Sequence, residues 1–159
     1  MASIPAYLQR IEAARSGTNP AMVCRVASGW VFLANMQYLS GYCILQSDPV
    51  VESINALEPE QRAVFLGDMA MVGDAILEVT GAYRINYAIM GNSEPVLHAH
   101  IVPRYLSEPE ELLHGLPWSY PQTQMDAVGF DPVRDQALMR KLAQAIQKRQ
   151  GVITTAPAA

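Results

Sequence analysis

The sequence predicts an α+β domain in which one long helix covers a five-stranded antiparallel sheet. Five short segments combine β-branched and aromatic residues with flanking turn residues, as strands do. Between the third and the fourth lies one long segment in which apolar residues recur every three or four positions, as on one face of a helix. The predicted order is helix, three strands, helix, two strands, helix, which suits one antiparallel sheet with helices packed against it.

Size and composition favour an ordinary globular domain and exclude several classes of protein. The 159 residues are 50% hydrophobic and 16% charged, so we expect a single domain over residues 1–150 and a flexible tail at 151–159. A net charge of −4 argues against a nucleic-acid-binding or anionic-membrane-binding protein, since both need a basic face. No apolar run reaches the ~18 residues of a membrane span, so no membrane partner is expected.

The cysteines and the first residues of the chain predict the compartment. Cys24 and Cys43 are too few for a disulfide framework and lack the spacing of metal ligands, so we expect two free thiols. Residues 1–15 lack the charge, the apolar run and the small-residue site of a signal peptide. Both observations favour a cytoplasmic protein.

The first part of the chain contains a short predicted helix and three predicted strands. A helix is expected at 4–15, because apolar residues are spaced there for one face: Ile4, Tyr7, Leu8 and Ile11. Strands are expected at 22–27, 30–34 and 41–46, and Ser28-Gly29 is a tight-turn signal between the first two. These three strands would form an antiparallel meander.

The longest helix is predicted to open at Glu58-Pro59-Glu60. Proline suits the first helical position, and acidic side chains suit the positive end of the helix dipole. Gly81 is expected as the C-cap, and a fourth strand is expected at 83–90. The apolar stripe of this helix consists of Phe65, Met69, Val72, Ile76 and Val79.

The segment at 106–131 changes character and precedes the last helix. It contains three prolines and two glycines with little periodicity, so we expect an irregular wrap, ordered in most of its length. Trp118 in this segment is expected to pack against other apolar side chains or to form one wall of a ligand site. Asp131-Pro132 is expected to start the final helix, whose inner stripe is Leu138, Leu142, Ala145 and Ile146.

A fifth strand, predicted at 95–105, holds two of the three histidines of the chain. Leu97, Ala99 and Ile101 alternate onto one face, which suits packing under a helix. His98 and His100 lie two residues apart on the other face, together with Val96 and Val102. Two imidazoles on an otherwise apolar strand are costly to bury without partners, so the pair requires an explanation.

Three chemistries fit this pair of histidines. The first is a metal site, which needs a third and usually a fourth ligand; the only other histidine is His114, and no acid or cysteine follows at a short spacing. The second is nucleophilic attack on phosphorus by one imidazole, assisted by the other and by the small polar loop at 91–93. The third is a pair of structural histidines that are satisfied by hydrogen bonds.

Several segments together resemble one known family. The stretch at 98–104, His-Ala-His-Ile-Val-Pro-Arg, resembles the end of the His-x-His-x-His signature of the histidine triad superfamily. Residues 41–45 resemble the family's Gly-His-x-Leu-Val strand, and residues 57–60 resemble the Leu-x-x-Glu segment before its central helix. The resemblance covers about residues 23–120. Similarity to a bacterial branch of diadenosine tetraphosphate hydrolase-like proteins lies in three stretches: Pro103-Arg104-Tyr105, Glu108-Pro109 and Pro117-Trp118.

The resemblance implies a nucleotide hydrolase or transferase that acts on nucleotidyl phosphoanhydrides or phosphoramidates. His98 matches the middle histidine, which is the nucleophile of the family, and His100 matches the last, which binds the phosphate. The implied partners are a nucleotide and a second copy of the chain, whose sheet joins the first; the implied site holds no metal and no cofactor. The implied nucleotide- and phosphate-binding residues are Asn35, Asn86, Asn92, Ser93 and Arg104.

Two departures from the family pattern keep a second function open. The first triad position is Val96 instead of histidine, and Tyr42 stands where many members have histidine after the glycine. Valine cannot donate a hydrogen bond, and tyrosine can donate one but cannot carry a positive charge. The alternative to an active hydrolase is therefore a nucleotide-binding protein or sensor of the same fold with weak catalysis.

Overall fold

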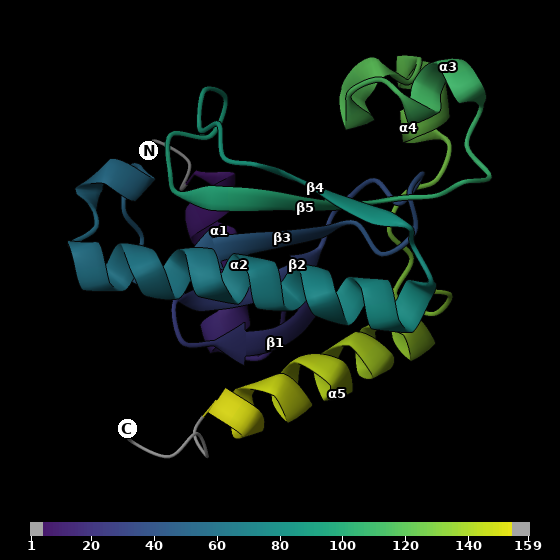
Figure 1. The fold of residues 1–159 in the computed structure, drawn as a ribbon. Helices are drawn as coiled ribbons and strands as arrows, with labels where there is room; N and C mark the ends of the chain where they lie inside the picture. Colours follow the sequence, from purple (N-terminus) through teal and green to yellow (C-terminus); the bar gives the residue numbers. More distant parts are fainter. Residues whose placement is uncertain (1–4, 154–159) are drawn as a thin grey trace.

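A five-stranded antiparallel sheet forms the centre of the protein, as the sequence predicts (Figure 1). The computed structural model describes residues 5–153. The strands lie in the order β1-β2-β3-β5-β4, and each neighbouring pair is antiparallel. Their bounds are β1 Met22–Val26, β2 Gly29–Leu33, β3 Cys43–Ser47, β4 Arg84–Ala88 and β5 His98–Arg104. The fold class is therefore α+β, and the meander of the first three strands is confirmed.

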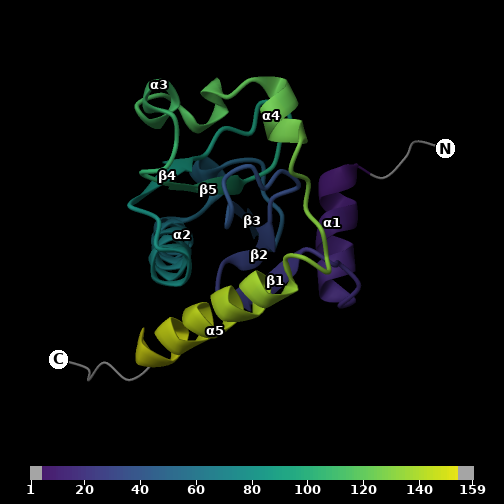
Figure 2. The same cartoon turned by 90° about the vertical axis from the view of Figure 1, so that its right-hand side faces the viewer.

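The long helices cover one face of this sheet, while the short helices lie above its other side (Figures 1 and 2). The main core packs side chains of the sheet against α2 and α5. Tyr42 and Val102 belong to a second apolar cluster, with Trp118 and Tyr120 packed against it. The helices are α1 Ala6–Arg15, α2 Pro59–Thr80, α3 Glu110–Leu113, α4 Gln122–Asp126 and α5 Gln136–Ile153, with 3₁₀ turns at Ile54–Ala56 and Pro117–Ser119.

Helix α2 begins and ends where the local sequence predicts. Pro59 occupies its first turn, and the Glu58 and Gln61 side chains form a reciprocal capping box. Gly81 ends the helix with a φ of 70°, a left-handed conformation that costs glycine little. Ile76 and Phe65 of the predicted stripe are fully buried, and burial of each such side chain contributes about 1.5–3 kcal/mol to stability.

Strand β5 lies between β3 and β4 and shows the predicted alternation. Leu97, just before it, and Ala99 and Ile101 within it belong to the main core on the α2 side. The opposite face carries His98, which is buried, and His100, which is half-buried. The sheet therefore presents both imidazoles on the face that α2 and α5 leave open.

Helix α1 differs from its prediction. It begins at Ala6, and Ile4 lies outside the described residues. Ile11 is buried as expected, but Leu8 is 39% exposed, so its assignment to the buried face was wrong. The helix contacts the rest of the protein along a narrow strip that includes Ile11 and Ala14.

The segment at 106–131, predicted to be irregular, contains short helices, and the long helix α5 follows it. The segment at 106–131 contains α3, the second 3₁₀ turn and α4. Helix α5 begins at Gln136, later than predicted, because Asp131 first closes a turn in which its side chain accepts hydrogen bonds from the backbone of Val133 and Arg134. The helix runs to Ile153, so the predicted tail at 151–159 starts within it, and residues 154–159 lie outside the described part.

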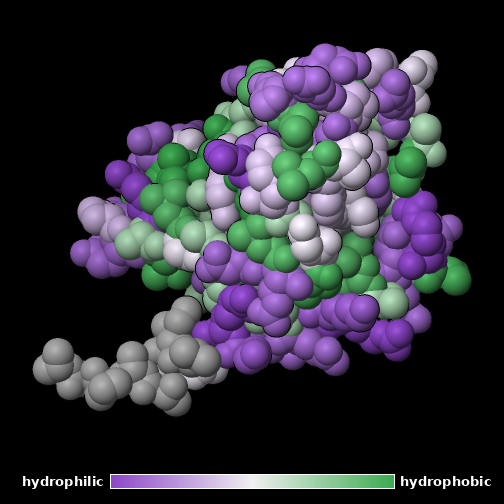
Figure 3. Space-filling model, turned by 45° about the vertical axis from the view of Figure 1, so that its right-hand side comes forward, coloured by the Kyte–Doolittle hydropathy of each residue, from purple (hydrophilic) through white to green (hydrophobic). Residues whose placement is uncertain are grey.

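The surface is mixed in character. On the face drawn in Figure 3, apolar groups form a broken band between polar margins above and below it. Among residues 5–153, no helix is both long and apolar enough to cross a membrane.

Candidate functional site

A pocket of about 480 Å³ lies on the open face of the sheet, next to the two histidines. This volume lies in the range of small-molecule sites. Five of the residues predicted for the site line it: Asn35, Asn92, Ser93, His98 and His100. The structure therefore brings together residues from the end of β2, the loop before β5 and β5 itself.

Local backbone geometry orients the imidazole of His98. Its Nδ1 lies 2.8 Å from the carbonyl oxygen of Val96. A carbonyl oxygen only accepts, so Nδ1 must carry a proton, and in the neutral form of the ring Nε2 holds the free lone pair. Val96, which replaces the first histidine of the family pattern, thus still orients His98 through its backbone.

His100 is held as a neutral imidazole beside His98, with 5.0 Å between the ring centroids. Burial, with a smaller effect of the neighbouring His98, lowers the pKa of His100 to about 4. The ring is therefore uncharged at neutral pH. The Trp118 ring packs edge-on against it, with 5.3 Å between the ring centroids.

Tyr42 sets the tautomer of His100. Its hydroxyl lies 2.6 Å from Nδ1 of His100. Burial raises the pKa of Tyr42 far above its usual value, and the opposing effect of the neighbouring Trp118 is smaller, so the hydroxyl keeps its proton. We assign the hydroxyl proton to the bond with Nδ1, which leaves Nε2–H of His100 as a donor.

The loop before β5 supplies small polar groups to the pocket. Gly91 has a φ of 79°, which turns the chain in a way that favours glycine. Asn92 and Ser93 follow it and line the pocket. On the far wall lies Asn35, whose backbone carbonyl accepts a hydrogen bond from Phe130 at 2.8 Å. Hydroxyl, amide and N–H groups of this kind suit the oxygens of a phosphate or ribose.

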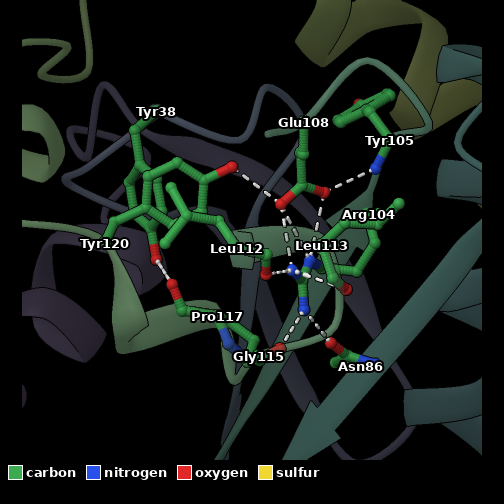
Figure 4. Close-up of polar contacts among 10 residues, drawn as sticks. All are labelled: Tyr38, Asn86, Arg104, Tyr105, Glu108, Leu112, Leu113, Gly115, Pro117 and Tyr120. Atoms are coloured by element: carbon green, nitrogen blue, oxygen red, sulfur yellow. Dashed lines mark hydrogen bonds and ion pairs between the residues drawn. The ribbon is translucent and has the colours of Figure 1, made fainter. Parts of the chain in front are cut away.

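Arg104 and Asn86 do not line the pocket, although the sequence places both among the expected phosphate ligands. Arg104 is only 2% exposed and forms an ion pair with Glu108, with 2.9 Å between Nη2 and Oε2 (Figure 4). Its Nη1 donates to Oδ1 of Asn86 and to the carbonyl of Gly115, both at 2.8 Å. Both residues therefore hold the chain after β5 in place.

This ion pair anchors the segment that carries Trp118. Glu108 also accepts hydrogen bonds from the backbone of Tyr105 and the hydroxyl of Tyr120, both at 2.7 Å (Figure 4). Burial would raise the pKa of Glu108, but Arg104 and the other donors hold it below its usual value. Tyr38 fastens the segment further by donating to the carbonyl of Pro117 at 2.9 Å. These bonds keep Trp118 against His100.

Two charged residues of the pocket were missed by sequence reasoning. Arg10 of α1 and Glu94 of the loop both line it and form a two-pronged ion pair, with N–O distances of 3.1 and 3.2 Å. Burial opposes the charge of Glu94, yet Arg10 keeps its pKa below the usual value. Glu94 directly follows Ser93, so its position was a usable signal, whereas nothing in the local sequence ties Arg10 to it.

The residues present were also tested against a metal site. Within residues 5–153, no three His, Cys, Asp or Glu side chains are grouped so that they could hold a metal ion. Cys24 and Cys43 are buried free thiols whose pKa values burial raises.

Comparison with known proteins identifies the fold. No protein-family model matches the chain, and no curated protein matches it by sequence. Solved structures do match. A histidine triad protein from Marinobacter aquaeolei VT8 is 22% identical with a TM-score of 0.68, over 88% of this chain and 94% of its own. A hypothetical histidine triad nucleotide-binding protein from Sulfolobus tokodaii is 13% identical with a TM-score of 0.69, over 95% of this chain and 99% of its own.

A third solved structure matches over a similar share of the chain. A zinc-bound histidine triad family protein from Mycobacterium smegmatis is 20% identical with a TM-score of 0.61, over 88% of this chain and 94% of its own. At these identities the matches establish that the chain has the fold of histidine triad proteins.

Proposed function

We propose that this chain, which has the histidine triad fold, is a nucleotide hydrolase or transferase that works through a nucleotidyl intermediate on His98. Its substrates would be nucleotidyl phosphoanhydrides or phosphoramidates. The observation that carries the proposal is the hydrogen bond between Nδ1 of His98 and the carbonyl of Val96, which directs the lone pair of Nε2 away from the backbone. A neutral imidazole with an oriented lone pair is a competent nucleophile toward phosphorus.

The proposed first step forms a phosphorus–nitrogen bond. Nε2 of His98 attacks the α-phosphorus, the bond to the leaving group breaks, and that group departs with the electron pair and takes a proton from water. His100 donates its Nε2–H to a phosphate oxygen, and Ser93 with the loop N–H groups stabilises the negative charge. In the second step water attacks the same phosphorus and gives a proton to solvent, the phosphorus–nitrogen bond breaks with its electron pair returning to Nε2 of His98, and a nucleoside monophosphate leaves.

A nucleotide-binding protein with weak catalysis is the second candidate. Two observations favour it: Val96 contributes no side-chain donor to the site, and Tyr42 stands in the place of a basic residue. Both candidates predict nucleotide binding, so binding alone does not separate them. Turnover and a trapped intermediate do.

The deciding experiment is intact-mass analysis after brief mixing with adenosine 5′-phosphoramidate and, separately, with a diadenosine polyphosphate. The His98→Ala variant runs alongside as the control, and release of adenosine monophosphate is followed in every case. Release or a transient nucleotidyl adduct, absent from His98→Ala, supports the hydrolase. Calorimetric binding with neither release nor adduct supports the binding protein, and absence of binding overturns both.

We propose in addition that two copies of the chain associate through the β4 edge. Strand β4 is the last in the strand order, and the side chain of Tyr87 in this strand is 43% exposed. Pairing of two such edges would continue the sheet across both copies. Light scattering should give twice the mass of one chain, and Tyr87→Lys should shift the protein toward the single-chain mass. A single-chain mass for the unaltered protein would contradict this assembly.

A further inference from the structure

The charge of the pocket bears on the kind of leaving group that it admits. Of the described residues that line the pocket, two are charged, Arg10 and Glu94, and they neutralise each other. His100 adds no charge, since burial keeps it neutral. Apart from the ring of the proposed nucleophile His98, the lining therefore offers a substrate no cation without a paired carboxylate, and the chain as a whole carries a net charge of −4.

Arg10 is not free to turn away from Glu94 toward a ligand. Its Nη1 also donates to Oε1 of Gln46 at 2.9 Å, and Gln46 is completely buried. The amide of Gln46 in turn donates to the backbone carbonyl of Tyr7 at 3.2 Å, which ties α1 to β3. Withdrawal of Arg10 would leave the buried oxygen of Gln46 without this donor, and such a loss is costly.

This arrangement also holds Glu94 close to the reacting groups. Gln46 and His98 are direct partners in the β3–β5 ladder, so Arg10 is fixed relative to His98. Glu94 follows Ser93 in the loop that lines the pocket, and its carboxylate lies within electrostatic reach of both His98 and His100. An anionic leaving group that extends toward Glu94 would therefore meet a fixed carboxylate, whose cationic partner Arg10 is already held by Gln46 and by Glu94 itself.

We propose that the Arg10–Glu94 pair selects nucleotidyl compounds whose leaving group carries no negative charge. The carboxylate of Glu94 would repel the negative charges of a polyphosphate. This inference rests on the function proposed above and names its substrate class: a nucleoside monophosphate joined to an amine. A polyphosphate brings several negative charges past Glu94, and unit charges in a partly buried site repel by kilocalories. An amine brings none, or a positive charge that Glu94 attracts.

The test compares two substrates across matched variants, in chelator so that no divalent cation masks the phosphates. Adenosine 5′-phosphoramidate and a diadenosine polyphosphate are assayed with the unaltered protein, Glu94→Gln and Arg10→Gln. Glu60→Gln, an exposed carboxylate at the start of α2, is the control for net charge. The quantity of interest is the ratio of kcat/KM for the polyphosphate to kcat/KM for the phosphoramidate.

The two variants should move this ratio in opposite directions. Glu94→Gln should raise it about tenfold, the size expected for removing one partly screened charge close to a polyanion. Arg10→Gln leaves Glu94 uncompensated and should lower the ratio. Damage to structure alone would move both variants in the same direction. A ratio that shifts the same way in both, or that Glu60→Gln shifts as much, overturns the inference.

A binding measurement separates this inference from the proposed function. Calorimetry in the His98→Ala background compares the affinities for the same two compounds, with and without Glu94→Gln. If the unaltered protein releases no monophosphate but Glu94→Gln still improves polyphosphate binding selectively, the hydrolase fails and the charge selection stands. If turnover is present but Glu94→Gln changes neither the ratio of the kcat/KM values nor the ratio of the two affinities, the charge selection fails and the proposed hydrolase stands.

Discussion

The hydroxyl of Tyr42 lies 2.6 Å from Nδ1 of His100. By donating to Nδ1, this hydroxyl places the ring proton of His100 on Nε2. Tyr42 replaces a histidine of the family pattern, yet it performs this task without carrying charge. A buried phenol that keeps its proton can donate it to a neutral imidazole and so fix the tautomer of that ring.

Removal of this hydroxyl should impair catalysis more than folding. In Tyr42→Phe, Nδ1 of His100 loses its donor, so the ring can adopt the tautomer that presents no proton to the phosphate. We expect kcat/KM for monophosphate release to fall about tenfold or more and the free energy of unfolding to fall by about 1 kcal/mol. Kinetics and urea unfolding measure the two effects. Tyr83→Phe, at a position 40% exposed, is the control; an equal loss in both variants would refute the assignment.

Separation of the buried Arg104–Glu108 pair should destabilise the protein strongly. Both side chains are nearly inaccessible, at 2% and 4% exposure, so Glu108→Ala leaves a buried guanidinium charge uncompensated. Such a loss costs about 3–5 kcal/mol. Chemical denaturation gives the free energy, and the fluorescence of Trp118 reports whether the segment leaves His100.

The ion pair of Glu78 with Arg149 provides the control, since it lies at the surface and Glu78 is 48% exposed. Glu78→Ala should cause a much smaller loss, because solvent screens exposed pairs. Comparable losses in Glu108→Ala and Glu78→Ala would mean that the buried pair has no special role in holding the segment.

The protein should lose stability between about pH 6.5 and pH 4. Burial lowers the pKa of His100 from 6.5 to about 4 in the folded state. Over this interval the unfolded chain binds a proton that the folded chain does not, so falling pH favours unfolding; above pH 6.5 neither state binds it. Thermal unfolding across pH measures the slope. His100→Asn should flatten the curve, whereas the exposed His114→Asn should not; equal curves for all three proteins would contradict the prediction.

Substitution by alanine at two glycines should change the stability of the protein in opposite directions. A Cβ on Gly29 would lie 1.9 Å from the backbone oxygen of Gln46, so Gly29→Ala must force β2 and β3 apart and should destabilise the fold. A Cβ on Gly67 of α2 would meet nothing within 4 Å. Gly67→Ala should stabilise by about 0.5–1 kcal/mol through helix propensity. Thermal melts of both variants test the pair, and a stable Gly29→Ala protein would show that the strands can adjust.

Elements whose signals are local were predictable from the sequence. Helix α2 is specified by Pro59 at its start, Gly81 at its end and the apolar stripe between them, all within one segment. The alternation of Leu97, Ala99 and Ile101 likewise determined which face of β5 is buried. Because the side-chain period of a strand is two, this assignment placed His98 and His100 together on the other face before any fold was known.

The partners of charged side chains could not be derived in this way. Arg104 follows directly on the histidine motif, yet it turns into the protein toward Glu108, because β5 ends there and the following segment folds back over it. Arg10 and Glu94 lie 84 residues apart in the chain and meet only because α1 crosses the open face of the sheet. The sequence by itself determined the elements, their buried faces and the histidine pair. The tertiary structure decided which charges face the pocket, because an ion pair depends on distances between elements that no local pattern records.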